Sequence, residues 1–147
     1  MKLKIRKNVL SEALNNVSKA LSSKNIVPIL SGIKFNLTKE KLILTASDND
    51  ITIQTEIEKS EDLEILKTGS IVIKGKYIID IIRKLDSEFI NMEIVDDYKV
   101  LIYTENSEFN LNGIDAREYP PIDLSLNDDF ISLSIKDFKN IINQTNY

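Results

Sequence analysis

The chain has 147 residues, of which 42% are hydrophobic and 29% charged, as in an ordinary globular domain with its own core. It contains neither cysteine nor histidine, which excludes disulfides, thiolate catalysis, the commonest general base and the commonest zinc ligand. No segment is apolar for the length of a membrane span, and the N-terminus lacks the apolar run of a signal peptide, so we expect a cytoplasmic protein without membrane contact.

A pattern of strand, polar turn and amphipathic helix occurs three times along the chain. After Ile5, Ile73 and Leu133, apolar residues follow at the fifth, eighth and ninth positions in every copy. Repetition of one supersecondary unit is typical of an array. The third copy reaches the C-terminus before its sheet can begin, so we expect the chain to be a fragment of a longer protein.

The first unit begins with a strand through Leu3 and Ile5 and a helix whose apolar stripe runs from Val9 to Leu21. The period then changes from helical to alternating. This alternation predicts strands over residues 33–37, 42–44 and 51–57, joined by polar turns at 38–40 and 47–50. Residues 2–58 therefore form a predicted β-α-β-β-β unit.

The second unit repeats this order. Residues 59–69 are rich in carboxylates and predict a surface connection. A strand over 70–74 and a helix over 76–85 follow, and then strands over 89–95, 99–103 and 108–112, with a hairpin turn at Asp96 and Asp97. Residues 113–121 interrupt regular structure because Pro120 and Pro121 cannot donate to a sheet.

Two such units make a closed α+β domain, because each helix has one apolar stripe and each antiparallel sheet one apolar face. We expect this domain to span residues 1–126. Residues 127–147 then form a linker and the first strand and helix of a truncated second domain, whose apolar residues cannot be buried by that stub alone.

Positive charge gathers at the start of the chain. Residues 1–41 hold nine cations against two carboxylates, although the whole chain has a net charge of −4. The outer faces of both predicted helices carry serine, asparagine and a few cations, and they lack the aromatic platforms that bind single strands. Such a face suits the backbone of a duplex, while a merely solvated surface remains the alternative.

Catalytic groups are not evident in the sequence. Asp48 and Asp50 lack the further oxygens, the glycine and the distal glutamate of a calcium loop, so a β-turn is the better interpretation. The pairs Glu105 with Glu108 and Asp96 with Asp97 fall in predicted hairpin connections. We therefore expect neither an enzyme nor a bound cofactor or metal.

Four segments, in the right order, resemble the DNA polymerase III β subunits of bacteria, which are sliding clamps. They are residues 25–32 (NIVPILSG), 42–50 (LILTASDND), 71–85 (the second strand and helix) and 113–121 (GIDAREYPP). The last is the most specific. The resemblance implies the DNA-clamp fold, with two helices on one face of antiparallel sheets in each domain, and a homodimeric ring of such domains around duplex DNA. It also implies a DNA replication processivity factor, an accessory subunit without catalytic residues of its own.

The resemblance also implies site residues. Lys24, Lys74 and Lys76 match basic positions that contact DNA without regard to base sequence, although Gly75 stands where some members have arginine. Phe109 and Leu111 match the apolar pair of the dimer interface. The replicative polymerase and the clamp loader would bind the C-terminal domains that this chain lacks.

Two other hypotheses stay open from the sequence. The first is an α+β protein-interaction module without a nucleic-acid role, in which the charge asymmetry is incidental. The second is a metal-dependent phosphoryl-transfer enzyme that uses Asp48 and Asp50.

Overall fold

The computed structural model describes residues 1–21, 27–48 and 50–121. The predicted stub at residues 127–147 and the third copy of the repeat lie outside this range. The described elements are β1 (Lys2–Arg6), α1 (Lys7–Ser18), the 3₁₀-helix η1 (Pro28–Ser31), β2 (Gly32–Leu37), β3 (Lys41–Ser47), β4 (Thr52–Glu58), β5 (Leu63–Lys67), β6 (Gly69–Lys74), α2 (Gly75–Lys84), β7 (Phe89–Val95), β8 (Lys99–Tyr103), β9 (Glu108–Asn112) and the 3₁₀-helix η2 (Ala116–Glu118).

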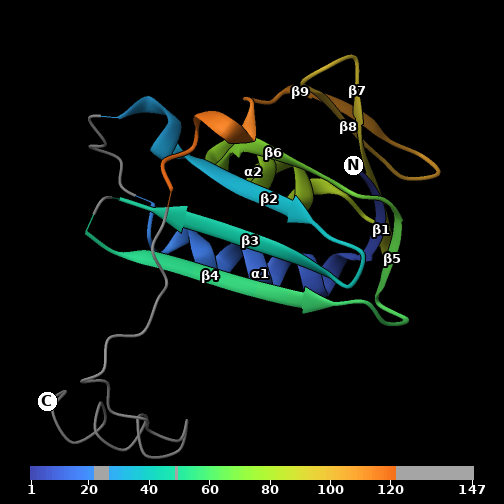
Figure 1. Ribbon diagram of the computed structural model, residues 1–147. Helices are drawn as coiled ribbons and strands as arrows, with labels where there is room; N and C mark the ends of the chain where they lie inside the picture. Colours follow the sequence, from blue (N-terminus) through green and yellow to red (C-terminus); the bar gives the residue numbers. More distant parts are fainter. Residues whose placement is uncertain (22–26, 49, 122–147) are drawn as a thin grey trace, which may run out of the picture.

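The strands form two antiparallel sheets that each mix the two units. One sheet has the order β5-β1-β7-β8-β9 and the other the order β4-β3-β2-β6. The first strand of each unit therefore joins the sheet of the other unit: β1 pairs with β7, and β6 pairs with β2. This exchange relates the two units by a pseudo-twofold arrangement and ties them into one body (Figure 1).

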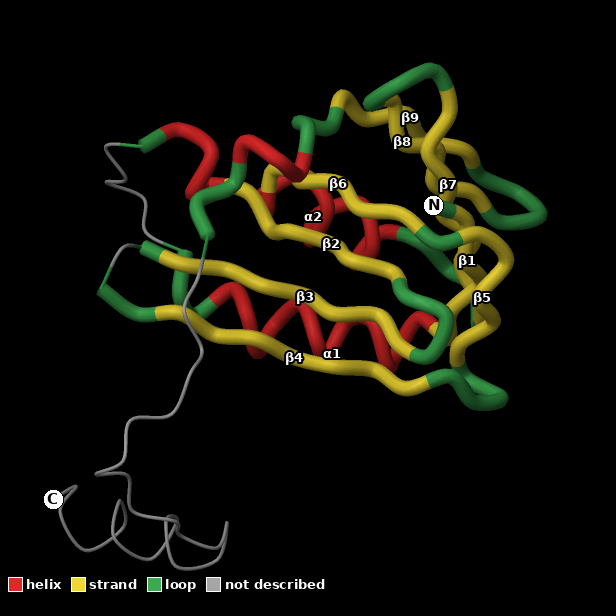
Figure 2. The backbone as a smooth tube through the Cα atoms, in the orientation of Figure 1, coloured by secondary structure: helices red, strands yellow, loops and turns green. Residues whose placement is uncertain are grey.

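The helices cover one face of the four-stranded sheet, with α1 behind β3 and β4 and α2 behind β6 and β2 (Figure 2). Both helices bury the stripe that the sequence predicts, including Leu10 and Leu14 of α1 and Ile78 and Ile82 of α2. A single core of apolar side chains joins both helices to both sheets. The predicted α+β class, with two helices on one face of antiparallel sheets, is confirmed.

The prediction of a surface connection over residues 59–69 is wrong, because this segment contains β5. Leu63 is fully buried, and β5 pairs with the outer edge of β1. Arg6 fixes this strand, since its Nε lies 2.6 Å from Asp62 Oδ1, its guanidinium also pairs with Glu88, and it stacks 4.7 Å from the centre of the Phe89 ring. One of the carboxylates that suggested a loop, Asp62, is therefore the ion-pair partner of a distant arginine.

Residues 113–121 begin at the free edge of β6 and continue to the other face of the four-stranded sheet. Ile114 and Val72 exchange two backbone hydrogen bonds, of 2.8 and 3.0 Å. Tyr119, only 4% exposed, closes a second apolar cluster with Val72 and with Leu30 of η1. The predicted interruption of regular structure is confirmed apart from the single turn of η2, and the tyrosine anchors the segment.

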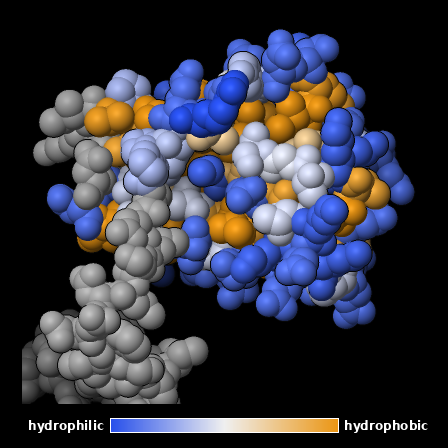
Figure 3. Space-filling view, in the orientation of Figure 1, coloured by the Kyte–Doolittle hydropathy of each residue, from blue (hydrophilic) through white to orange (hydrophobic). Residues whose placement is uncertain are grey.

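The sheet surface turned away from the helices is mostly hydrophilic, with several hydrophobic areas between the polar residues (Figure 3). Among the described residues, neither helix has the length and apolar character needed to cross a membrane.

Candidate nucleic-acid interface

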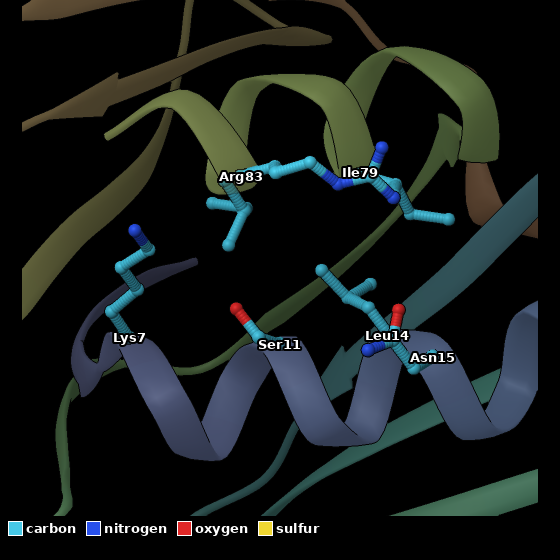
Figure 4. A pocket seen from close by; sticks show the side chains of 7 residues that line it. Lys7, Ser11, Leu14, Asn15, Ile79 and Arg83 are labelled. Atoms are coloured by element: carbon cyan, nitrogen blue, oxygen red, sulfur yellow. The ribbon is translucent and has the colours of Figure 1, made fainter. Parts of the chain in front are cut away.

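A groove separates α1 from α2 on the side of the domain away from the four-stranded sheet. Its cavity volume is about 190 Å³. Leu14, Ile79 and Ile82 form its apolar floor, and polar side chains form its rim (Figure 4). The rim residues are Lys7, Ser11 and Asn15 of α1 and Arg83 of α2.

The two helices run in opposite directions along this groove. The ammonium of Lys7, at the start of α1, donates a hydrogen bond to the carbonyl of Leu85, just after the end of α2. At the other end of the groove, Leu21 lies against Gly75, where a Cβ atom would come within 2.4 Å of Leu21 Cδ1. The absence of a side chain at Gly75 therefore permits the segment that follows α1 to approach the start of α2 closely.

The exposed flanks of the helices carry positive charge that is not neutralised internally. From Lys7 to Lys19 and from Gly75 to Lys84 there are five cations and two carboxylates. None of these cations belongs to the ion pairs found in the described part of the chain. Most exposed carboxylates instead lie on strands and hairpins, for example Glu56, Glu58 and Glu108. The helix side is thus the more cationic side of the domain.

The structure places Lys76 with this helix surface. Lys76 precedes Ile79 and Arg83 by three and seven residues, and those spacings put all three on one flank of α2. Arg83 extends along α2 toward Ile79 (Figure 4). Arg83 therefore borders the same groove as Lys7, and Lys76 lies on the same flank of α2.

Lys74 lies elsewhere. It is the residue that precedes α2, and its Nζ sits 5.2 Å from the centre of the Tyr77 ring. Tyr77 points away from the groove, toward β9. The structure therefore separates Lys74 from Lys76, and Lys24 lies outside the described residues.

Phe109 and Leu111 belong to β9, an edge strand that pairs only with β8 in its sheet. Both are partly buried and pack against the core. Leu111 also lines a hollow of about 300 Å³ between β9 and the start of α2. Lys74, Tyr77 and Ile114 line the same hollow, and Tyr77 and Ile114 are 49% and 36% exposed.

The aspartates considered as candidate chemistry lie in turns. Asp48 Oδ1 accepts backbone hydrogen bonds from Ile51 at 2.7 Å and Asp50 at 3.0 Å, and these bonds lower the pKa of Asp48. That is the geometry of a turn, as predicted. Asp96 and Asp97 both have positive φ, which confirms the predicted hairpin turn. Within the described ranges no group of three potential metal ligands occurs.

Lys7 gains its importance as part of the groove rim only from the structure. The helical periodicity already placed Arg83 on an outer face, but it did not show that Lys7 would oppose it across the groove. The spacing of Lys7, Ser11 and Asn15 at every fourth residue is the signal that could have indicated a shared polar flank.

The pseudo-twofold pair of units, the cationic helix side and the edge strand with a neighbouring hollow together define a domain of the DNA-clamp class. Residues 1–123 match the family described as "DNA polymerase III beta subunit, N-terminal domain". The chain belongs to this family.

A relative named "Beta sliding clamp" from Staphylococcus epidermidis is 39% identical over 151 residues, and the match covers 100% of this chain. A Staphylococcus aureus protein of the same name is 38% identical. The crystal structure of the DNA polymerase sliding clamp from Bacillus subtilis is 38% identical with a TM-score of 0.81, over 84% of this chain and 33% of that one. The DNA polymerase III β chain from Streptococcus pneumoniae is 31% identical with a TM-score of 0.90, over 98% of this chain and 39% of that one.

The chain spans 40% of the length of the Staphylococcus relatives. The fold and the family are therefore established for this part of such a protein.

Proposed function

We propose that this chain is the N-terminal part of a sliding clamp, a replication processivity factor that encircles duplex DNA and tethers the replicative polymerase. The observation that carries the proposal is the polar, weakly cationic helix side of the domain. The domain that presents this side has the fold of the DNA polymerase III β family. The domain would end near residue 126, and a second domain would begin after it.

The charge on the helix side fits a protein that must move along DNA. Each phosphate neutralised by a cation lowers log K by about 0.9 per decade of salt. Five cations against two carboxylates on the helix flanks can make only a few such contacts. Binding then stays weak and independent of base sequence, because direct base recognition needs forked side chains inserted in a groove. Retention on DNA comes from ring closure.

Ring closure requires a contact between protomers, and β9 suits it. An edge strand offers backbone groups for pairing, and exposed apolar side chains beside it favour association. Phe109 and Leu111 would pack against the partner protomer, while Lys24 and Lys76 would contact the duplex. The protein would be a homodimer in the cytoplasm. Its contacts with the polymerase and the clamp loader would use the domains that this chain does not cover.

The proposal is tested by comparing retention on closed and cut circular DNA, with the full-length protein that contains this chain. The protein, loaded by a clamp loader, should stay on nicked circular DNA through gel filtration and should leave once the circle is cut. A Phe109→Asp variant should lose retention and sediment as a monomer, because a charge would be buried at the contact. A Lys39→Glu variant, changed at an exposed turn, is the control and should be retained.

Equal retention on circular and linear DNA would refute the encircling mechanism. Complete failure of the wild-type protein to bind DNA under these conditions would favour the alternative of a protein-interaction module.

A further inference from the structure

Asn112 and Gly113 form the one Asn-Gly pair in the 147-residue sequence. They lie where β9 ends and the chain enters the segment over residues 113–121. In such a pair the backbone nitrogen of the glycine can attack the side-chain carbonyl carbon of the asparagine, because glycine has no Cβ atom to hinder the approach. The pair is therefore a candidate site of covalent modification.

The carboxamide of Asn112 contains the carbon that would be attacked. Asn112 is exposed, and its carboxamide forms no hydrogen bond with any residue that the structure describes. No hydrogen bond therefore holds this side chain away from the backbone of Gly113.

The backbone nitrogen of Gly113, in contrast, is held in place. It donates a hydrogen bond of 2.7 Å to the carbonyl of Tyr98, and the next residue, Ile114, exchanges two backbone hydrogen bonds with Val72. The attack requires that this nitrogen lose its proton and turn toward the asparagine side chain, and both changes break the bond to Tyr98. The reaction therefore needs a local opening of the junction between β9 and the segment that follows.

The packing around Gly113 explains why a reactive pair is present at all. A Cβ atom at this position would come within 2.6 Å of Ile71 Cγ1 and 2.9 Å of the Tyr98 carbonyl oxygen. A larger residue, which would slow the attack, is thus excluded by the close approach of the backbone. The fold requires the glycine, and the hydrogen bonds of the junction protect the pair.

We propose that Asn112 is a deamidation site that reacts when Gly113 is released from Tyr98. A bond forms between the Gly113 nitrogen and the side-chain carbonyl carbon of Asn112. The bond from that carbon to the amide nitrogen breaks, and ammonia leaves with the proton of the Gly113 nitrogen. Water then opens the cyclic imide to aspartate or isoaspartate at position 112.

Either product adds a negative charge at the end of β9. Isoaspartate also places an extra carbon in the main chain, so position 112 would lose its register with Lys99 of β8. The modification would therefore prevent this end of the strand from closing again.

Asn106, in the hairpin between β8 and β9, provides a comparison within the same chain. The residue that follows it is Ser107, whose Cβ atom hinders the attack. Asn106 is exposed, and the Ser107 nitrogen donates no hydrogen bond to the residues that the structure describes. Folding should therefore slow the reaction at Asn112 much more than the reaction at Asn106.

The experiment incubates the 147-residue chain at about pH 8.5, with and without urea, and measures deamidation at each asparagine by peptide mass spectrometry. Asn112 should react at least about tenfold more slowly in the folded chain, whereas Asn106 should change by less than about threefold, because only Asn112 awaits local opening. An Asn112→Gln variant keeps an amide but moves it farther from the backbone. It should lose the product at position 112, which assigns the signal.

The variant Tyr119→Ala tests the opening step without changing the reactive pair. Tyr119 packs on Val72, to which Ile114 is bonded, so its loss should loosen the junction. Deamidation at Asn112 in the folded chain should then become about tenfold faster, with little change at Asn106. Lys39→Ala, in an exposed turn, is the control and should leave both rates unchanged.

Three results would overturn the proposal. Absence of the product at Asn112 in urea would refute the site itself. Equal rates at Asn112 in the folded and the unfolded chain would refute protection by the junction. An acceleration in Tyr119→Ala that is as large at Asn106 as at Asn112 would show general unfolding in place of local opening.

Discussion

Removal of Lys76 and Arg83 together tests whether the groove between the helices faces DNA. Both are exposed on one flank of α2, and Arg83 lines the groove. Neither belongs to an ion pair within the described chain. Alanine is the best helix former, so the double variant Lys76→Ala, Arg83→Ala should fold normally. Any change in DNA affinity then reflects the loss of these two charges alone.

The size of the effect follows from counterion release. Two phosphate contacts contribute about 1.8 to the slope of log K against log salt. Between 50 and 200 mM salt, the wild-type affinity should therefore fall about 12-fold more than that of the double variant. The affinities of the two proteins should converge at high salt, where the condensed ions no longer drive binding.

Fluorescence anisotropy on a short linear duplex measures this slope, because a closed ring can thread onto an open end. The control is the double variant Lys39→Ala, Lys59→Ala, which removes two exposed cations from turns outside the helices. It should keep the wild-type slope. If the control lowers the slope as much as the groove variant does, the binding reflects overall charge and the inference about the groove is wrong.

Two further predictions concern the segment after β9. The hydroxyl of Tyr119 is buried without a hydrogen-bond partner of good geometry, and burial raises its pKa. Tyr119→Phe should therefore raise the free energy of unfolding by about 1 kcal/mol in urea titrations, whereas Tyr119→Ala should lower it by about 3–5 kcal/mol. A loss of stability in the phenylalanine variant would show instead that the hydroxyl is hydrogen-bonded, with the Ser47 amide as the candidate donor. Arg117, its backbone amide and the Tyr98 hydroxyl hold the pKa of Asp115 well below its ordinary value of 3.8. A depressed folded-state pKa stabilises the fold above the unfolded value, so this contribution is complete above pH 3.8 and declines as the pH falls below it. Urea titrations from pH 7 to pH 2 should show wild-type and Asp115→Asn stabilities converging at the acid end, and a constant difference would contradict this role of Asp115.

Local patterns in the sequence predict most of the fold correctly. The helix over 76–85 and the strands over 89–95, 99–103 and 108–112 coincide with α2, β7, β8 and β9 to within one residue. These elements have strong periodicity, because each buries one face and exposes the other. β5 escapes prediction for the opposite reason: only Leu63 is fully buried in it, and Asp62, which precedes it, pairs with Arg6, which is distant in the sequence.

The sequence likewise predicts some residues of the candidate site and not others. The sequence places Lys76 and Arg83 on an outer helix face, and it identifies Phe109 and Leu111 on one face of a strand. It does not show that Lys74 stacks on Tyr77 beside β9, because the spacing between Lys74 and Lys76 suggests two neighbours on one surface. The start of α2 lies between them, and the turn of the helix sends them to different flanks.

The amino-acid sequence by itself determined the repeated unit, the class of elements, the polar character of the helix faces and the family. These properties depend on the order of apolar and polar residues within a few turns of chain. Only the tertiary structure decided that β1 and β6 exchange sheets, that Lys7 meets α2 across a groove, and that Lys74 borders the edge of β9. Such contacts join residues separated by tens of positions, and the packing of the whole core selects them.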